Sequence, residues 1–198
     1  KLKAAGITPI AIGSKALWPT AGWFDYLNLR VNGHSFHMAL TQGSVPYTDA
    51  RVQAVFERWD ELVRPGYFLA NHAAIDWQDA VPAFVRGQAA MYLMGNFALD
   101  LMRKGGLKDT QIGFMAFPKI ADIAQAEEAP TDTVHIPARA RNKADARRFL
   151  SYLVRPEVQT RFNARMGQLP VHQQAKPPAD PLLAQGADLL AKAAGLAQ

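Results

Sequence analysis

One short stretch, residues 87–97 (GQAAMYLMGNF), constrains the fold more than any other part of the chain. Residues 88–94 form an apolar run bounded by glycines, and this run is too short for an isolated amphipathic helix. A Gly-Asn pair ends the run. Residues 98–103 then have a helical pattern, with Asn96 as a suitable N-cap and Gly105 as a stop. We therefore predict a buried strand that passes through a tight turn into a helix.

The end of such a strand is where open α/β sheets bind their ligands. Phe97 follows Asn96 at this point, so an aromatic ring and an amide are adjacent. A capping Asn and a core Phe would give the same pattern, and a short motif alone does not separate the two interpretations. The turn is thus a candidate ligand contact, with a purely structural turn as the alternative.

Composition limits the classes of protein to consider. The 198 residues are 49% hydrophobic and can bury the core of one large domain or two small ones. Cysteine is absent, which excludes disulfides, thiolate metal sites and a cysteine nucleophile. The net charge is +5, and the basic residues are densest in residues 139–165. They fall on the polar faces of two predicted helices without interleaved aromatic residues, so we expect a solvated face and no nucleic-acid partner.

Strand and helix patterns alternate along the chain, as is typical of an α/β fold. Strands are expected at residues 7–12, 88–94 and 112–117, with a further apolar run at residues 133–136. Residues 120–130 are expected to be an exposed connection, and residues 168–180 a loop. A short helix or turn is expected at residues 34–41. Helices are expected at residues 21–31, 50–64, 78–86, 98–103, 143–154, 156–166 and 181–196, with Phe149 among the buried residues.

Patterns that would indicate catalysis or metal binding are weak. His34 and His37 would share a helical face, but no third ligand lies nearby in the sequence. Neither a Gly-x-Ser-x-Gly motif nor a phosphate-binding glycine loop occurs. Asp76 and Asp79 are acids at a predicted helix start, where they favour the helix dipole. We predict no catalytic residue, no metal site and no cofactor. The alternative is a small α/β glycoside-processing enzyme that uses Asp76 or Asp79, although such enzymes need a pair of carboxylates.

Aromatic residues at the ends of elements are the stronger signal. Trp18, Trp77 and Phe97 all occupy such positions, whereas the other two tryptophans lie in helical stripes and are expected in the core. Flat rings stack on the apolar faces of pyranose sugars. Amides and carboxylates, such as those of Asn96 and Asp132, bind sugar hydroxyls. Each hydrogen bond contributes only about 0.5–1.5 kcal/mol net, so several groups must converge on the sugar.

The order of these motifs resembles a known family. The shared features are KLKAAGITPIAI at the start, the Gly-Tyr-Phe at residues 66–68, the GQAAMYL block with its Gly-Asn-Phe, and the helix pair at residues 142–167 followed by Leu-Pro-Val. With these features the chain resembles the extracellular solute-binding proteins of bacterial ABC sugar importers, the group that includes maltose-binding protein. The resemblance implies an α/β fold of the periplasmic-binding-protein type II kind. Such a fold has two lobes joined by a hinge, and the lobes close around a sugar.

The resemblance also implies roles for individual residues. In relatives, the aromatic residue after Gly-x at the strand end stacks on sugar. That residue is commonly Trp and is Phe97 here, which implies a smaller platform. Trp18 corresponds best to a second stacking residue in the loop after the first strand. Asp132 precedes the strand that leads back to the hinge, a region that supplies polar sugar contacts. The implied partners are a carbohydrate ligand and the transmembrane subunits of an ABC permease, and the implied location is periplasmic or extracellular.

The same resemblance implies a division of the chain. Residues 1–118 correspond to most of the carboxy-terminal lobe and residues 119–130 to a connection. Residues 131–167 would cross into the other lobe, and residues 168–198 would form the hinge return and a final helix. An amino-terminal part and a tail present in relatives are expected to be missing from this chain. A truncated chain of this kind is expected to self-associate through an uncovered helix face, and a non-binding fragment is the alternative to a working receptor.

Overall fold

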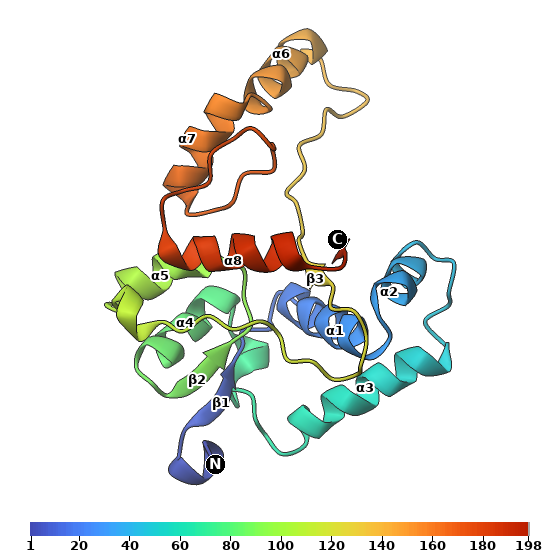
Figure 1. Ribbon diagram of the computed structural model, residues 1–198, viewed down its shortest axis with the longest axis vertical. Helices are drawn as coiled ribbons and strands as arrows, with labels where there is room; N and C mark the ends of the chain where they lie inside the picture. Colours follow the sequence, from blue (N-terminus) through green and yellow to red (C-terminus); the bar gives the residue numbers. More distant parts are fainter. Residues whose placement is uncertain (198) are drawn as a thin grey trace.

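The computed structural model describes residues 1–197 and consists of a main body with a helix pair that projects from it (Figure 1). None of its helices, within these residues, has the length and apolar character needed to cross a bilayer. The helices are α1 (Trp18–Val31), α2 (His34–Thr41), α3 (Ala50–Val63), α4 (Trp77–Val85), α5 (Ala98–Lys104), α6 (Lys143–Leu153), α7 (Pro156–Met166) and α8 (Pro181–Lys192). The strands are β1 (Thr8–Ala11), β2 (Ala89–Tyr92), β3 (Glu127–Glu128) and β4 (Leu196–Ala197).

Strands β1 and β2 form a parallel pair in which Thr8 lies opposite Ala89 and Ile10 lies opposite Met91. An isolated parallel bridge joins Ile10 to Phe68 on the other side of β1. Both strands were predicted, but β2 is less buried than expected. Ala89 is buried but Met91 is exposed. Within residues 1–197 the strand β2 pairs only with β1.

The main core lies between β1 and the helices α1, α2 and α3. Trp23 of α1 packs edge-on against Phe68, with ring centroids 5.2 Å apart. At the start of α3, Asp49 accepts a hydrogen bond from Arg51 N, as expected of an N-cap. Val52 and Val55 of α3 are buried, but Phe56 and Val63 are about half exposed. The apolar residues of α3 therefore extend beyond the face that is buried against the core.

Residues 112–117 were predicted to form a buried strand, and this prediction was wrong. They are extended but pair with no strand of the described chain, and Met115 is exposed. Phe117 packs instead on α1, where its ring stacks on Tyr26 at 5.0 Å and its carbonyl accepts a hydrogen bond from Arg30 Nε at 3.2 Å. Residues 133–136 also form no strand.

The sequence predicts an exposed connection at residues 120–130, but part of this connection is buried. Ala126 and Glu127 are buried, because β3 pairs in parallel with β4 and both pack against α1 and α2. Helix α8 ends before residue 196 for the same reason, since the chain turns into β4. At its other end, α8 is capped by Asp180, whose Oδ2 lies 2.7 Å from Arg103 Nη1 of α5.

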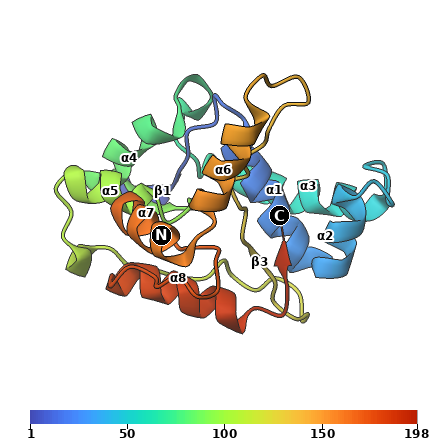
Figure 2. The ribbon, with the colours of Figure 1, turned by 90° about the horizontal axis from the view of Figure 1, so that it is seen from above.

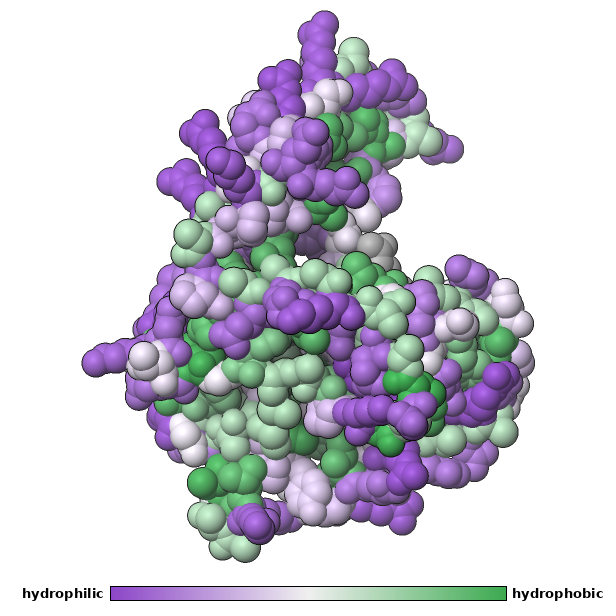
Figure 3. All heavy atoms as spheres, viewed as in Figure 1, coloured by the Kyte–Doolittle hydropathy of each residue, from purple (hydrophilic) through white to green (hydrophobic). Residues whose placement is uncertain are grey.

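Helices α6 and α7 project from the body, and the view from above places them over it rather than beside it (Figure 2). Both helices were predicted, but the prediction that Phe149 of α6 is buried was wrong. No residue of α6 is buried, and Phe149 is 57% exposed. Figure 3 shows apolar surface on this projecting pair. Asn142 also makes no side-chain capping bond. The division into lobes and a crossing segment stays a prediction.

Candidate functional site

Three aromatic residues from separate helix starts form one cluster, which we call the aromatic triad. Trp18 is the first residue of α1, Trp77 is the first residue of α4, and Phe97 directly precedes α5. The Trp77 and Phe97 ring centroids are 5.1 Å apart. The Trp18 centroid lies 6.3 Å from that of Trp77 and 6.2 Å from that of Phe97. Three of the five predicted ligand-binding residues are thus brought together.

The sheet explains why these residues meet. Because β1 and β2 are parallel, their carboxyl ends lie at the same edge, and each strand leads into a helix there. Trp18 was expected in the loop before α1 but belongs to the helix itself, with Pro19 in its first turn. The rings contact one another in edge-on or tilted geometry, which is favourable for aromatic pairs. Trp18 remains 46% exposed, so the triad is open to solvent.

Backbone contacts hold the loops before Trp18 and Trp77 together. A β-carbon on Gly13 would lie 2.2 Å from the carbonyl oxygen of Asp76, so only glycine allows this approach. Ser14 N donates to His72 O at 2.8 Å, and Ser14 Oγ lies 2.7 Å from His72 Nδ1. Lys15 N donates to Ile75 O at 3.1 Å. These contacts fix the positions of the two tryptophans relative to each other.

Polar groups flank the triad. The Lys15 ammonium lies 3.2 Å from Asp76 Oδ2, and this half-exposed pair directly precedes Trp77. The Tyr92 hydroxyl donates to Trp77 O at 2.6 Å, and burial raises the pKa of Tyr92. The aspartate that the glycosidase alternative would use therefore forms an ion pair with a lysine that sequence reasoning had not singled out. The adjacency of Lys15 and Asp76 carries no local sequence signal, because 61 positions separate them.

Asn96 lies next to Phe97, but the predicted capping role was wrong. The N-cap position of α5 is Phe97, and no side-chain capping bond is made there. The Asn96 amide instead lies against α8, because a β-carbon on Gly186 would come within 2.9 Å of Asn96 Nδ2. Asn96 therefore connects the triad to α8.

The fifth predicted residue, Asp132, is not part of the triad. It is exposed on the connection that runs from β3 to α6 (Figure 1). Its assignment as a ligand contact stays a prediction. The two histidines of α2 make contacts within the body: His34 Nε2 is 3.0 Å from Leu196 O, and His37 Nδ1 is 3.2 Å from Asn28 Nδ2.

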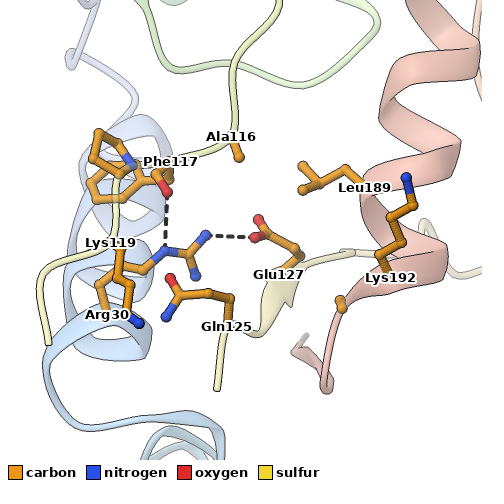
Figure 4. A pocket seen from close by; sticks show the side chains of 10 residues that line it. Arg30, Ala116, Phe117, Lys119, Gln125, Glu127, Leu189 and Lys192 are labelled. Atoms are coloured by element: carbon orange, nitrogen blue, oxygen red, sulfur yellow. Dashed lines mark hydrogen bonds and ion pairs between the residues drawn. The ribbon is translucent and has the colours of Figure 1, made fainter. Parts of the chain in front are cut away.

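A hollow of about 420 Å³ lies apart from the triad, between α1, the connection at residues 116–125 and α8 (Figure 4). The buried side chains of Arg30 and Glu127 form an ion pair at its edge, with Nη2 and Oε1 2.5 Å apart. Arg30 also donates to the carbonyl oxygens of Phe117 and Ala126. Arg30 and Glu127 are 97 positions apart, so no local pattern predicted their pairing. Through its contacts with Ala126 and Glu127, the Arg30 guanidinium links α1 to β3 and the residue before it.

Comparison with known proteins identifies the family of the chain and supports its fold. The family model described as bacterial extracellular solute-binding protein matches residues 1–160. The chain belongs to this family. Members of the family are transport proteins rather than enzymes. The family resemblance inferred from the sequence is thereby confirmed.

A curated relative is an uncharacterized ABC transporter extracellular-binding protein of Pyrococcus horikoshii. It is 31% identical over 181 residues, which are 91% of this chain and 39% of the relative. A second such protein from the same organism is 29% identical over half of this chain. The chain therefore spans well under two thirds of the solute-binding proteins that it matches.

Solved structures of solute-binding proteins share the fold over almost the whole chain. The bacterial solute receptor AcbH, described as having an exclusive preference for β-D-galactopyranose, superposes with a TM-score of 0.86 at 27% identity. The superposition covers all of this chain and 51% of AcbH. A structure described in connection with xylan utilization by a thermophilic Caldanaerobius bacterium gives 0.80 at 23% identity, over 98% of this chain and 52% of that one. The predicted α/β fold of the type II binding-protein kind is confirmed.

Proposed function

We propose that the intact gene product is a sugar receptor that delivers its ligand to the transmembrane subunits of an ABC permease, and that it catalyses no reaction. The aromatic triad carries this proposal, since three rings from three helix starts meet at the carboxyl edge of a parallel sheet. Their apolar faces suit the C–H faces of a pyranose. The neighbouring Lys15–Asp76 pair and Asn96 offer hydrogen-bonding groups for sugar hydroxyls. By its family, the receptor would act in the periplasm or outside the cell.

The division of the chain fits this function. Residues 1–118 with α8 would supply one wall of the binding cleft, and residues 131–167 would belong to the second lobe. Asp132 lies at the start of that crossing, and closure of the lobes would bring it towards the ligand. Because AcbH is similar over the whole chain and prefers a galactopyranose, D-galactose is the first ligand to test.

Calorimetric titration of the intact gene product with D-galactose, and then with xylose, raffinose and chitin oligosaccharides, tests the proposal. Trp18→Ala and Phe97→Ala are each expected to weaken binding about tenfold or more, because a stacked ring at a site centre contributes more than about 1 kcal/mol. Phe56→Ala is the matched control, since Phe56 is a half-exposed Phe of α3 whose ring contacts Phe24 and Trp59 rather than the triad. If Trp18→Ala and Phe97→Ala both bind sugar as tightly as the Phe56→Ala control does, the triad is rejected as the binding site. Absence of binding to every sugar would reject the ligand class.

A further inference from the structure

Leu17, the residue before Trp18, has a backbone conformation that leucine seldom adopts. Its φ is 62° and its ψ is −33°, and within residues 1–197 it is the only residue other than glycine with a positive φ. Trp18 N donates to Ala16 O at 2.8 Å, which closes a three-residue γ-turn around Leu17. The β-carbon of a leucine is crowded in this conformation, and glycine would adopt it without strain.

The surrounding structure forces this conformation on Leu17. Leu17 N donates to Ser14 O at 3.0 Å. Its carbonyl oxygen accepts bonds from Thr20 N at 2.9 Å, from Ala21 N at 3.1 Å and from the Thr20 hydroxyl. The preceding residues of the loop are in turn bonded to the segment before Trp77. Strained conformations persist where the surroundings determine them in this way, and they cluster at ligand sites.

Packing within the chain does not explain why a leucine is present. The Leu17 side chain is 70% exposed, so it gains little burial in return for the strain of its backbone. The adjacent Trp18 is also exposed and belongs to the aromatic triad. A contact outside the folded chain would account for an exposed leucine with a strained backbone, and the ligand of the triad is the adjacent candidate.

We propose that Leu17 is a further ligand-contact residue, whose isobutyl group packs on the C–H groups of the sugar that stacks on Trp18. This inference rests on the proposed sugar-binding function. An aliphatic group beside the ring extends the apolar surface of the triad and selects ligands with an apolar edge or exocyclic CH₂ at that position. The side chain is exposed at the surface of the body. The strain of the turn lowers the stability of the fold, and the contact with the sugar raises the affinity for the ligand.

The test compares Leu17→Gly and Leu17→Ala in the intact gene product, with D-galactose as the first probe and thermal unfolding measured in parallel. Glycine removes both the side chain and the strain, whereas alanine removes only the side chain. We expect both variants to bind about fivefold to tenfold more weakly, because each removes the apolar contact of the isobutyl group with the sugar. We expect the melting temperature without sugar to rise in the glycine variant only.

Other outcomes would overturn the inference. Unchanged affinity in both Leu17 variants, together with weak binding by Trp18→Ala, would show that Leu17 does not contact the sugar while the proposed function stands. If Trp18→Ala also bound normally, the triad itself would be rejected. A fall in melting temperature of several degrees in Leu17→Ala, with affinity unchanged, would show that the side chain packs against another part of the intact protein.

Discussion

Protonation of Glu128 is expected to make the stability of this protein depend on pH. Glu128 lies in β3 and its side chain is 13% exposed, with Oε1 3.7 Å from His37 Nε2 of α2. Burial, followed by the negative charges of Asp25 and Glu127, raises the pKa of Glu128 from 4.5 to about 7. The other ionisable groups near this cluster are Tyr26 and Arg30 of α1, and His34 of α2.

The direction and size of the effect follow from this difference in pKa. The folded protein holds the Glu128 proton more tightly than the unfolded chain does. Its stabilising contribution is therefore complete below pH 4.5 and is lost as the pH rises to about 7. A difference of this size corresponds to at most about 3 kcal/mol in the free energy of unfolding. Asp25, whose pKa burial raises to about 6, acts in the same direction at lower pH. His37 acts oppositely, because burial lowers its pKa and its protonation below pH 6.5 destabilises the fold.

Replacing Glu128 by Gln isolates its contribution, because the amide resembles the protonated carboxyl and carries no charge at any pH. We expect Glu128→Gln to match the parent protein at pH 4 and to exceed its free energy of unfolding by about 1–3 kcal/mol at pH 8. Urea unfolding of the intact gene product at both pH values measures this difference. Glu61→Gln, at an exposed position of α3, is the control for the change from Glu to Gln. An equal effect of Glu128→Gln at the two pH values would refute the reasoning.

Three further predictions concern packing. Arg30→Met should destabilise the protein by about 3–5 kcal/mol, because Glu127 is left as an unpaired buried charge, and the double variant with Glu127→Gln should regain most of this in urea unfolding. Gly22→Ala in α1, where a β-carbon meets no atom within 4 Å, should raise stability by about 1 kcal/mol. Gly186→Ala should lack this gain, since its β-carbon would press on Asn96, and equal melting temperatures of the two variants would contradict the contact. The 198-residue chain should self-associate in sedimentation velocity and do so less after Phe149→Ser, whereas unchanged association would exclude the α6 face as the contact.

The elements that could be predicted from the sequence are those with a strong local signal. The strand β1 follows a glycine and has β-branched residues, α3 begins at a capping aspartate, and α7 begins at a proline and ends at a glycine with positive φ. Each of these features acts over a few residues. Residues 112–117 have the composition of a strand but lack a neighbouring strand, and an apolar run does not reveal whether a partner exists.

The candidate site could be predicted in part for the same reason. Trp18 and Phe97 follow recognisable strand ends, so parallel pairing of β1 and β2 brings them to one edge. Trp77 begins a recognisable helix, but contacts between the loops before Trp18 and Trp77 bring it to the same place. The backbone conformation of Leu17 had no sequence signal, because hydrogen bonds from several segments impose the positive φ on this leucine. The Arg30–Glu127 pair was missed because arginine is common on the exposed faces of helices, and its partner is distant in the sequence.

An apolar stripe is often taken to predict both that a helix forms and that its apolar face is buried. In α6 and α7 only the first of these holds. Their periodicity predicted both helices correctly, yet their apolar side chains, including Phe149 and Phe162, are exposed. Periodicity records which face of a helix must be covered in the functional protein, and it does not say what covers it. Solute-binding proteins of known structure are about twice as long as this chain. If residues 131–167 belong to a second lobe, as we propose, the same stripe that leaves α6 and α7 exposed here forms the core of that lobe. In that arrangement, packing of this face in the second lobe would hold residues 131–167 in place, and Asp132 at their start would lie towards the ligand.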